Sequence, residues 1–250
     1  MKTRADHSTY RRQPEGKSMH GRIVSDLGLA IVSGTLQPGD RLPPEPQLLE
    51  RYEISRPVLR EAVRVLVAKG LVVSRQRAGA LVRPRSEWHL LDPDVLYWLI
   101  QTKPQQEFLN TLMEVRRTFE PAAAALAAKA ATDAQVRDIE EAFAGMAAAT
   151  DVEQLLEPDL AFHRRIAEAT GNDLMAYIGN MLSLALRESI ILSSQLPNTH
   201  ALSLPRHEAI LTAIRNRDPL AARQATLVQL QETDDDLSNV LSTKGIVDLA

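Results

Sequence analysis

The pattern of hydrophobic and polar positions in Leu42–Val82 predicts two short helices followed by a hairpin. The first helical pattern covers residues 45–52. The second opens at Ser55, a favourable N-cap residue, and ends before Gly70, which suits the left-handed position that closes a helix. Its apolar residues recur at spacings close to 3 and 4, as on one face of an amphipathic helix, and are Val58, Leu59, Ala62, Val63, Leu66 and Val67.

Two short apolar segments, residues 71–74 and 80–82, come next and are typical of strands. The basic turn between them contains Arg75, Arg77 and Gly79. Two helices and a basic hairpin in this order predict a winged helix-turn-helix, in which the arginines of the wing reach phosphates or the minor groove.

The polar face of the second helix points to DNA. Ser55, Arg56 and Arg60 lie at its N-terminal end, where a recognition helix meets base edges in the major groove. An arginine there suits the O6 and N7 atoms of guanine. A single arginine more often only solvates a helix surface, but the complete arrangement with its wing favours a DNA-binding domain.

The charge distribution agrees with this interpretation. Residues 1–85 carry 16 Lys and Arg against 8 Asp and Glu, whereas the remaining residues carry 13 against 24. A basic part on an acidic remainder favours local contact with a polyanion. Cysteine is absent, which excludes disulfides and thiolate metal sites. No segment approaches the roughly 18 apolar residues of a membrane span, so we expect a cytoplasmic protein without membrane contact.

The 250 residues are long enough for two domains. We expect a mainly α protein, with a winged helix-turn-helix followed by an all-α helical bundle. The expected parts are a disordered arm (1–18), the DNA-binding domain (19–84), a linker (85–91), an effector-binding and dimerisation domain (92–240) and a tail (241–250). Helices are expected at residues 19–33, 92–101, 105–130, 133–149, 151–170, 173–194, 204–216 and 218–240.

Three residues of the helical half form a candidate metal site. Asp159 and His163 stand at i and i+4 on one helix face, and His207 is expected in the first turn of the helix that Pro205 opens. Two imidazoles and a carboxylate are ligands for zinc, nickel or manganese. Such an Asp–His pair is more often a solvated contact within one helix, so both interpretations stay open on the residues alone.

Motifs in both halves resemble one family. The DNA-binding part resembles the N-terminal domain of GntR-type bacterial transcription regulators through Leu42-Pro43, Ser55-Arg56, Leu59-Arg60-Glu61-Ala62, Leu66, Gly70-Leu71 and Gly79. The helical part resembles the effector domain of the FCD (FadR-like) subgroup through Glu114-Val115-Arg116, Asp159 to His163, Thr170-Gly171-Asn172 and His207 to Leu211. Within that subgroup, Trp88–Trp98 resembles the repressors of D-galactonate catabolism.

The resemblance implies roles for individual residues. Ser55, Arg56, Arg60 and the wing tip near Arg77 and Gly79 match DNA-contacting positions, although Pro46 stands where family members often have Arg. In the effector domain, Asp159, His163 and His207 match three metal ligands. The usual fourth ligand, a histidine, falls on Gln229, which implies a weaker site.

Arg116 matches a position that faces the effector, and a guanidinium is a natural bidentate partner for a carboxylate. On the residues alone, a salt bridge with Glu120 is an equally good interpretation.

The function that the resemblance implies is ligand-controlled DNA binding. A homodimer would bind double-stranded operator DNA as a repressor and release it when a sugar acid such as D-galactonate binds Arg116, Asp159, His163 and His207. One alternative is a metal-dependent enzyme fused to a DNA-binding domain, against which stands the lack of a general base, since Glu168 lies off the face of His163. Another is a constitutive DNA-binding protein whose helical domain only dimerises.

Overall fold

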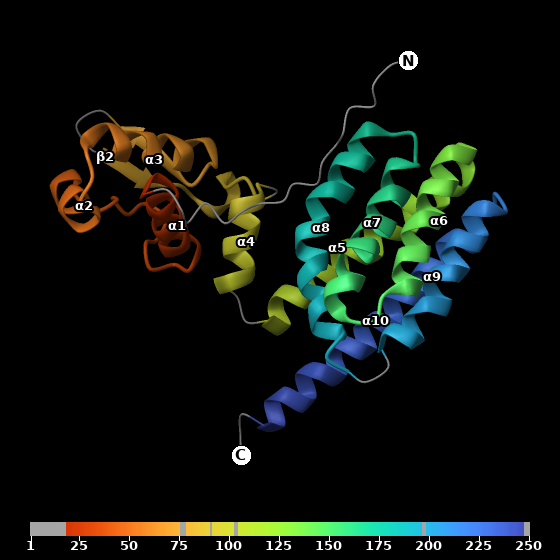
Figure 1. Cartoon of the computed structure of the whole chain (residues 1–250). Coiled ribbons are helices and arrows are strands. Elements are labelled where there is room, and N and C mark those ends of the chain that lie inside the picture. The colour runs from red at the N-terminus through yellow and green to blue at the C-terminus, as the bar shows by residue number, and fades with distance from the viewer. Residues whose placement is uncertain (1–18, 76–78, 91, 103–104, 197–198, 248–250) are drawn as a thin grey trace. The chain divides into compact units, whose positions relative to one another are not determined.

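A computed structural model describes residues 19–75, 79–90, 92–102, 105–196 and 199–247, drawn in colour in Figure 1. The predicted arm (1–18) and Arg77 lie outside these residues. The chain divides into two compact units, Met1–Thr102 and Lys103–Ala250. The first contains α1 (Met19–Val32), α2 (Glu45–Tyr52), α3 (Arg56–Ala68), β1 (Val72–Arg75), β2 (Gly79–Val82), η2 (Arg85–Glu87) and α4 (Pro93–Thr102). The second contains α5 (Gln105–Ala130), α6 (Asp133–Ala148), α7 (Val152–Glu168), α8 (Asp173–Ser193), α9 (Thr199–Arg215) and α10 (Pro219–Val247).

The N-terminal unit packs α1 against α3 around an aliphatic core. This core includes Ile23, Leu27 and Ile31 of α1 and Leu59, Ala62 and Leu66 of α3. Gly70 follows the end of α3 with φ 73°, so the predicted left-handed closing residue is confirmed. Val67, which we predicted on the buried face, is 39% exposed because it lies at the edge of the apolar stripe.

The wing is an antiparallel hairpin in which Val72 pairs with Val82 and Arg75 with Gly79. A third segment adds to it: Arg41 forms an isolated bridge with Leu81, and the amide of Leu42 donates to the carbonyl of Ala80 at 2.9 Å. The sequence did not predict this pairing, because a single bridge followed by Pro43 leaves no alternating pattern.

Helix α4 belongs to the N-terminal unit, not to the bundle in which we expected it. Its Val95, Trp98 and Leu99 are buried in the same core as α1 and α3. Trp98 lies so close to Gly28 of α1 that a Cβ built on this glycine would be 2.3 Å from the indole ring. The expected start of the second domain at residue 92 therefore moves to about residue 103.

Polar residues begin most helices of the C-terminal unit. Thr132 and Gln135 form a capping box at α6, and Asp151 accepts a hydrogen bond from the amide of Gln154 at α7. Asn172 and Asp218 accept from amides in the first turns of α8 and α10.

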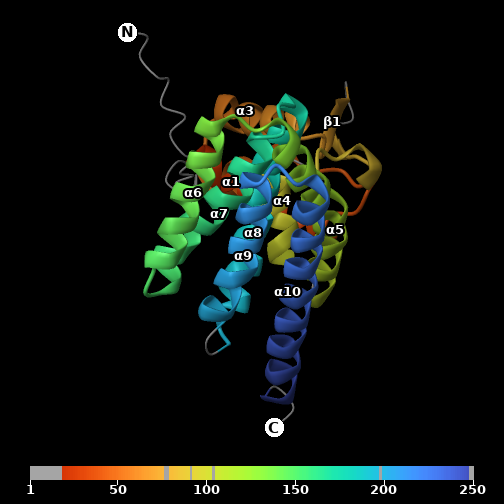
Figure 2. The ribbon, with the colours of Figure 1, turned by 90° about the vertical axis from the view of Figure 1, so that its right-hand side faces the viewer.

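Two boundaries differ from the prediction. Helix α9 starts at Thr199, so Pro205 lies inside it and His207 lies further along the helix than expected. Proline is favoured in a first turn but fixes no boundary when packing continues the helix upstream. Helix α10 continues to Val247, through most of the predicted tail, and its C-terminal part projects beyond α9 (Figure 2).

In the bundle, α10 packs against α5 and α9, and α7 packs against α6 and α8. Small residues of α5 allow this close packing, since Ala123, Ala124, Ala127 and Ala128 are all buried. Among the residues that the structure describes, no helix is both long and apolar enough to cross a bilayer.

Candidate DNA-binding surface and effector pocket

The N-terminal end of α3 presents the predicted DNA-contacting residues to solvent. Ser55 is the N-cap and is exposed, as are Arg56 and Arg60. Arg56 forms an ion pair with Glu45 of α2 at 3.2 Å, and its side chain is 71% exposed. An exposed pair of this kind contributes little stability, so the guanidinium is available to another partner.

The wing presents Arg75 at the end of β1, and this residue is exposed. Gly79 begins β2 with φ 76°, a left-handed conformation that favours glycine in the turn. Arg77 lies outside the described residues, so its role stays a prediction.

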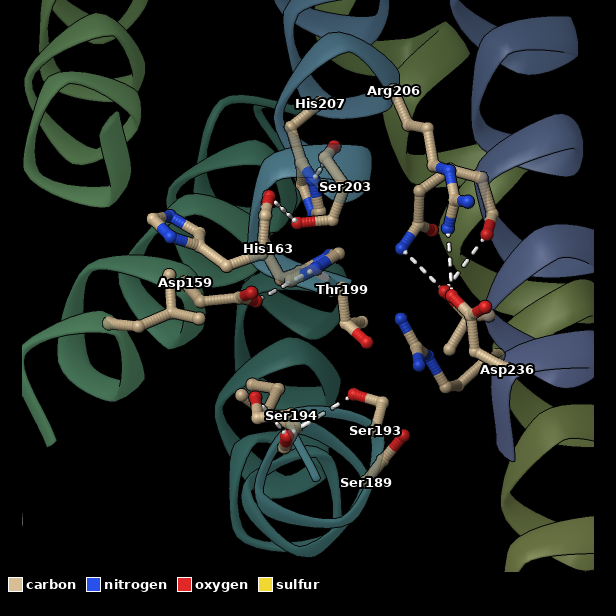
Figure 3. A pocket seen from close by; sticks show the side chains of 16 residues that line it. Asp159, His163, Ser189, Ser193, Ser194, Thr199, Ser203, Arg206, His207 and Asp236 are labelled. Carbon is tan, nitrogen blue, oxygen red and sulfur yellow. Dashed lines mark hydrogen bonds and ion pairs between the residues drawn. The ribbon is translucent and has the colours of Figure 1, made fainter. Parts of the chain in front are cut away.

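The three candidate metal ligands converge in the C-terminal unit. Asp159 and His163 come from α7 and His207 from α9, and one ligand atom of each lies within 4.8 Å of the others. The side chains of Asp159 and His163 are 9% and 8% exposed, which decides against the solvated pair left open by the sequence. Figure 3 shows the two helices bringing these side chains to one side of a cavity.

Both imidazoles are oriented by neighbouring oxygen atoms. Nδ1 of His163 lies 3.2 Å from Oε2 of Glu120, and its Nε2 lies 3.3 Å from Oδ1 of Asp159. Nδ1 of His207 lies 2.9 Å from the carbonyl of Ser203. Because a carbonyl only accepts, Nδ1 of His207 carries the proton and Nε2 keeps its lone pair.

The charges of the cluster are strongly coupled. Burial lowers the pKa of His163, but the carboxylates of Glu120 and Asp159 outweigh burial and raise this pKa to about 9. Burial raises the pKa of Glu120, yet Arg116 and His163 together hold it far below its usual range. Burial lowers the pKa of His207, so without a metal the cluster pairs a protonated His163 with a neutral His207.

Arg116 is buried and its guanidinium faces Glu120, with Nε 2.6 Å from Oε1 and Nη2 3.4 Å from Oε2. The salt bridge considered from the sequence is therefore present, but it is buried and continues through Glu120 to His163. Glu120 is a site residue whose contact with His163 the sequence did not predict, because α5 and α7 meet only in the folded bundle.

A cavity of about 40 Å³ adjoins the cluster. Its lining includes Arg116, Asp159, His163, His207 and Gln229, and also Arg206, which the sequence did not single out. Arg206 forms ion pairs with Glu232 and Asp236 of α10 on the side opposite the cluster (Figure 3). The only feature of the sequence that could have indicated Arg206 as a site residue is its position next to His207.

The donor set fits a divalent metal. Nε2 of His207 and Oε1 of Gln229 are buried atoms without a hydrogen-bond partner among the described residues. Buried acceptors are rarely left unpaired, so two of them lining one cavity beside the carboxylate of Asp159 point to a bound group. Carbonyl or carboxylate oxygens and imidazole nitrogens are ligands for zinc, nickel and manganese.

Comparison with known proteins identifies the family. Residues 20–82 match the profile of bacterial regulatory proteins of the gntR family, and residues 111–232 match the FCD domain. The galactonate operon transcriptional repressor of Escherichia coli (strain K12) is 33% identical over 222 residues, covering 88% of this chain and 96% of the relative. The chain belongs to the GntR family of transcription regulators. This GntR regulator has an FCD domain, and its matches decide against the enzyme alternative.

A second relative supports the assignment to a family of transcription regulators, and a solved structure supports the fold. The transcriptional regulator LutR of Bacillus subtilis (strain 168) is 32% identical, over 83% of this chain and 96% of its own length. The solved structure of Lar, a protein that controls the agr system of Listeria monocytogenes, matches with a TM-score of 0.61 at 19% identity. It covers 89% of this GntR regulator and 98% of its own chain, and it supports the fold alone.

Proposed function

We propose that this GntR regulator is a cytoplasmic homodimeric repressor of a carbohydrate-acid operon, released from its operator by a small carboxylate such as the sugar acid D-galactonate. The observation that carries the proposal is the buried polar cavity that Arg116, Asp159, His163 and His207 line. A guanidinium beside metal-type donors suits an anion with metal-binding oxygens. The Escherichia coli relative is named for a galactonate operon, which supports a sugar acid as the ligand class.

Asp159, His163 and His207 would hold a divalent ion (zinc, nickel or manganese), with Gln229 as a weak fourth ligand. Such an ion would supply positive charge that attracts the oxygens of the ligand. Glu120 and the carbonyl of Ser203 fix the two imidazoles through Nδ1, which leaves each Nε2 for coordination. Metal sites commonly depend on outer partners of this kind.

Arg116 would bind the carboxylate of the effector. Its Nε and Nη2 already face Glu120, whereas its Nη1 faces the sulfur of Met113 at 3.9 Å. A thioether is a weak acceptor, so the hydrogens on Nη1 stay available to a carboxylate. Glu120 would thus orient both the arginine and the histidine that meet the ligand.

Release from DNA would follow because side chains of α5, α7, α8, α9 and α10 all line the cavity. An effector that binds these helices together would favour one arrangement of the bundle over others, and its binding energy would shift the regulator towards a state that binds the operator less tightly. Typical couplings of about 1–3 kcal/mol change the affinity at a second site about 5- to 150-fold.

On DNA, Ser55, Arg56 and Arg60 would read base edges, and Arg75, Arg77 and Gly79 of the wing would contact the backbone or minor groove. A homodimer would place one recognition helix in each half of an inverted repeat. Sedimentation of the full chain at micromolar concentration tests the dimer, and a monomer would contradict it.

Calorimetry with D-galactonate on the full, metal-loaded chain tests the effector site. We expect saturable binding, and we expect Arg116→Lys to weaken it at least tenfold, because lysine has one nitrogen and cannot pair with both oxygens of Glu120 while presenting a further nitrogen to the ligand. Arg117→Lys is the matched control, since Arg117 pairs with Asp234 and does not line the cavity. If none of a panel of organic acids binds, a constitutive DNA-binding protein replaces the proposal.

A further inference from the structure

Hydroxyl side chains gather on one wall of the cavity. They come from α8, from the residue after its end, and from α9, and they are Ser189, Ser193, Ser194, Thr199 and Ser203. In Figure 3, Ser189, Ser193 and Ser194 lie together at the bottom, Thr199 lies at the centre and Ser203 lies beside His207. These hydroxyls are polar and uncharged, whereas the Asp159–His163–His207 cluster and the Arg206–Asp236 pair, which also line the cavity, are ionic.

Four of these hydroxyls already donate their hydrogens. Ser193 and Ser194 both donate to the carbonyl of Ile190, at 3.2 and 2.7 Å. Thr199 donates to Leu196 at 3.0 Å, and Ser203 donates to His200 at 2.9 Å. Since a carbonyl only accepts, the oxygen of each hydroxyl keeps only lone pairs for another partner. This part of the wall can accept hydrogen bonds but cannot donate them.

Ser189 is different. Its side chain is 1% exposed, and its Oγ has no hydrogen-bond partner among the described residues. A buried hydroxyl without a partner is unfavourable unless a ligand or a water satisfies it. It lies one helical turn before Ser193, on the same face of α8.

We infer that this hydroxyl wall (Ser189, Ser193, Ser194, Thr199 and Ser203) is a specificity subsite for the hydroxyl groups of a polyhydroxylated carboxylate. The inference rests on the proposed function and adds which atoms select the ligand. The O–H groups of the ligand donate to the back-bonded serines and threonine, and Ser189 supplies the one hydroxyl that can also donate.

A carboxylate without hydroxyls binds poorly for a physical reason. It would remove water from the oxygens of the wall without replacing those hydrogen bonds. Sites built to bind a hydroxyl discriminate strongly against analogues that lack it, because their polar groups are left unpaired.

Serine back-bonding alone is common in helices and is not evidence of a site. Ser183 shows this, since it donates to the carbonyl of Gly179 at 3.1 Å on the same helix and does not line the cavity. The wall differs because its five hydroxyls, together with that of Thr233 on α10, line one cavity, and because Ser189 is buried without a partner among the described residues.

The test compares two acids by calorimetry on the full-length, metal-loaded protein. D-galactonate carries hydroxyls along its chain, whereas 2-hydroxyhexanoate keeps the carboxylate, the neighbouring hydroxyl and the chain length. Both can therefore reach a metal in the same way. We expect D-galactonate to bind at least tenfold more tightly.

Ser189→Ala and Ser193→Ala assign the difference to the wall. Ser189→Ala removes a hydroxyl without a partner among the described residues, and Ser193→Ala leaves the Ile190 carbonyl with the amide and hydroxyl of Ser194. Neither change leaves a buried carbonyl unpaired, so we expect both variants to fold. Each variant should lower the affinity for D-galactonate about three- to tenfold, as the loss of one hydrogen bond does, and leave the affinity for 2-hydroxyhexanoate unchanged. Ser183→Ala should change the affinity for neither acid.

The outcomes separate the two proposals. If neither acid binds, the proposed function fails, and this inference fails with it. If both acids bind with equal affinity, or if the two variants weaken both acids alike, only the hydroxyl wall is refuted.

Discussion

Oε2 of Glu120 lies 3.2 Å from Nδ1 of His163, so a carboxylate of α5 orients the imidazole that α7 contributes to the candidate metal site. The same carboxylate contacts Arg116 through both of its oxygens. Glu120 therefore connects the two kinds of group, a metal ligand and a guanidinium, that we propose for effector binding.

Replacing Glu120 with glutamine should weaken metal binding about 10- to 100-fold, the usual effect of losing an outer partner of a metal-bound histidine. The measurement is competition with a chromogenic chelator. Glu114→Gln is the matched control, because Glu114 is exposed on the same helix. Equal metal affinity in Glu120→Gln and the wild type would show that Glu120 does not support the site.

The stability of the metal-free protein should depend on the protonation of His163. Its pKa rises from 6.5 to about 9 on folding because, despite burial, Glu120 and Asp159 favour the charged form. This stabilisation is fully present below pH 6.5 and is lost as the pH rises through 9. We expect the Tm in the presence of a chelator to fall across this window.

His163→Gln should remove this part of the pH dependence, and a substitution of the exposed His89 is the control. If the Tm of the wild type changed with pH as little as the Tm of His163→Gln does, this result would contradict the charged state that we assign to His163.

Gln229→His should tighten metal binding. Gln229 is 4% exposed, lines the cavity and has an Oε1 without a partner among the described residues, so an imidazole at this position replaces a weak neutral oxygen ligand by a stronger nitrogen ligand. Gln231→His, on the exposed side of the same helix, is the control. Unchanged affinity for zinc and nickel in Gln229→His would place Gln229 outside the coordination shell.

Arg56→Ala and Arg60→Ala should each weaken specific DNA binding by about 1–3 kcal/mol, the loss expected for a base contact. Arg64→Ala is the comparison on the same helix, since Arg64 lies further from the N-terminal end of α3 than Arg56 and Arg60 do. The assay is titration of selected DNA at fixed salt. Wild-type affinity in both Arg56→Ala and Arg60→Ala would refute the assignment of α3 as the recognition helix.

The sequence predicted those features that depend on local pattern. The spacing of Asp159 and His163 on one helix, and the starts of α6 and α8 at residues 133 and 173, all follow from contacts within a few residues of the chain. The convergence of His207 with the other two ligands was implied only by family resemblance, because no local pattern brings α9 to α7.

Features that depend on tertiary packing were missed. Trp98 packs on Gly28 of α1, which assigns α4 to the N-terminal unit although its sequence pattern is that of any amphipathic helix. The serines of α8 were not identified from the sequence either, because serine is common in helices and the sequence does not show which serines line the same cavity. Whether a serine hydroxyl donates to a backbone carbonyl or lacks a partner can be determined only from the hydrogen bonds of the folded structure.

The most direct measurement of ligand-controlled DNA binding is the affinity for operator DNA with and without D-galactonate. The DNA is a fragment selected by the wild-type protein from a random pool, and the titrations use the full, metal-loaded chain. We predict that D-galactonate weakens DNA binding about 5- to 150-fold in the wild type. His163→Ala should bind the same DNA with unchanged affinity and show no response to the acid. A full response in His163→Ala, or no response in the metal-loaded wild type, would contradict the account.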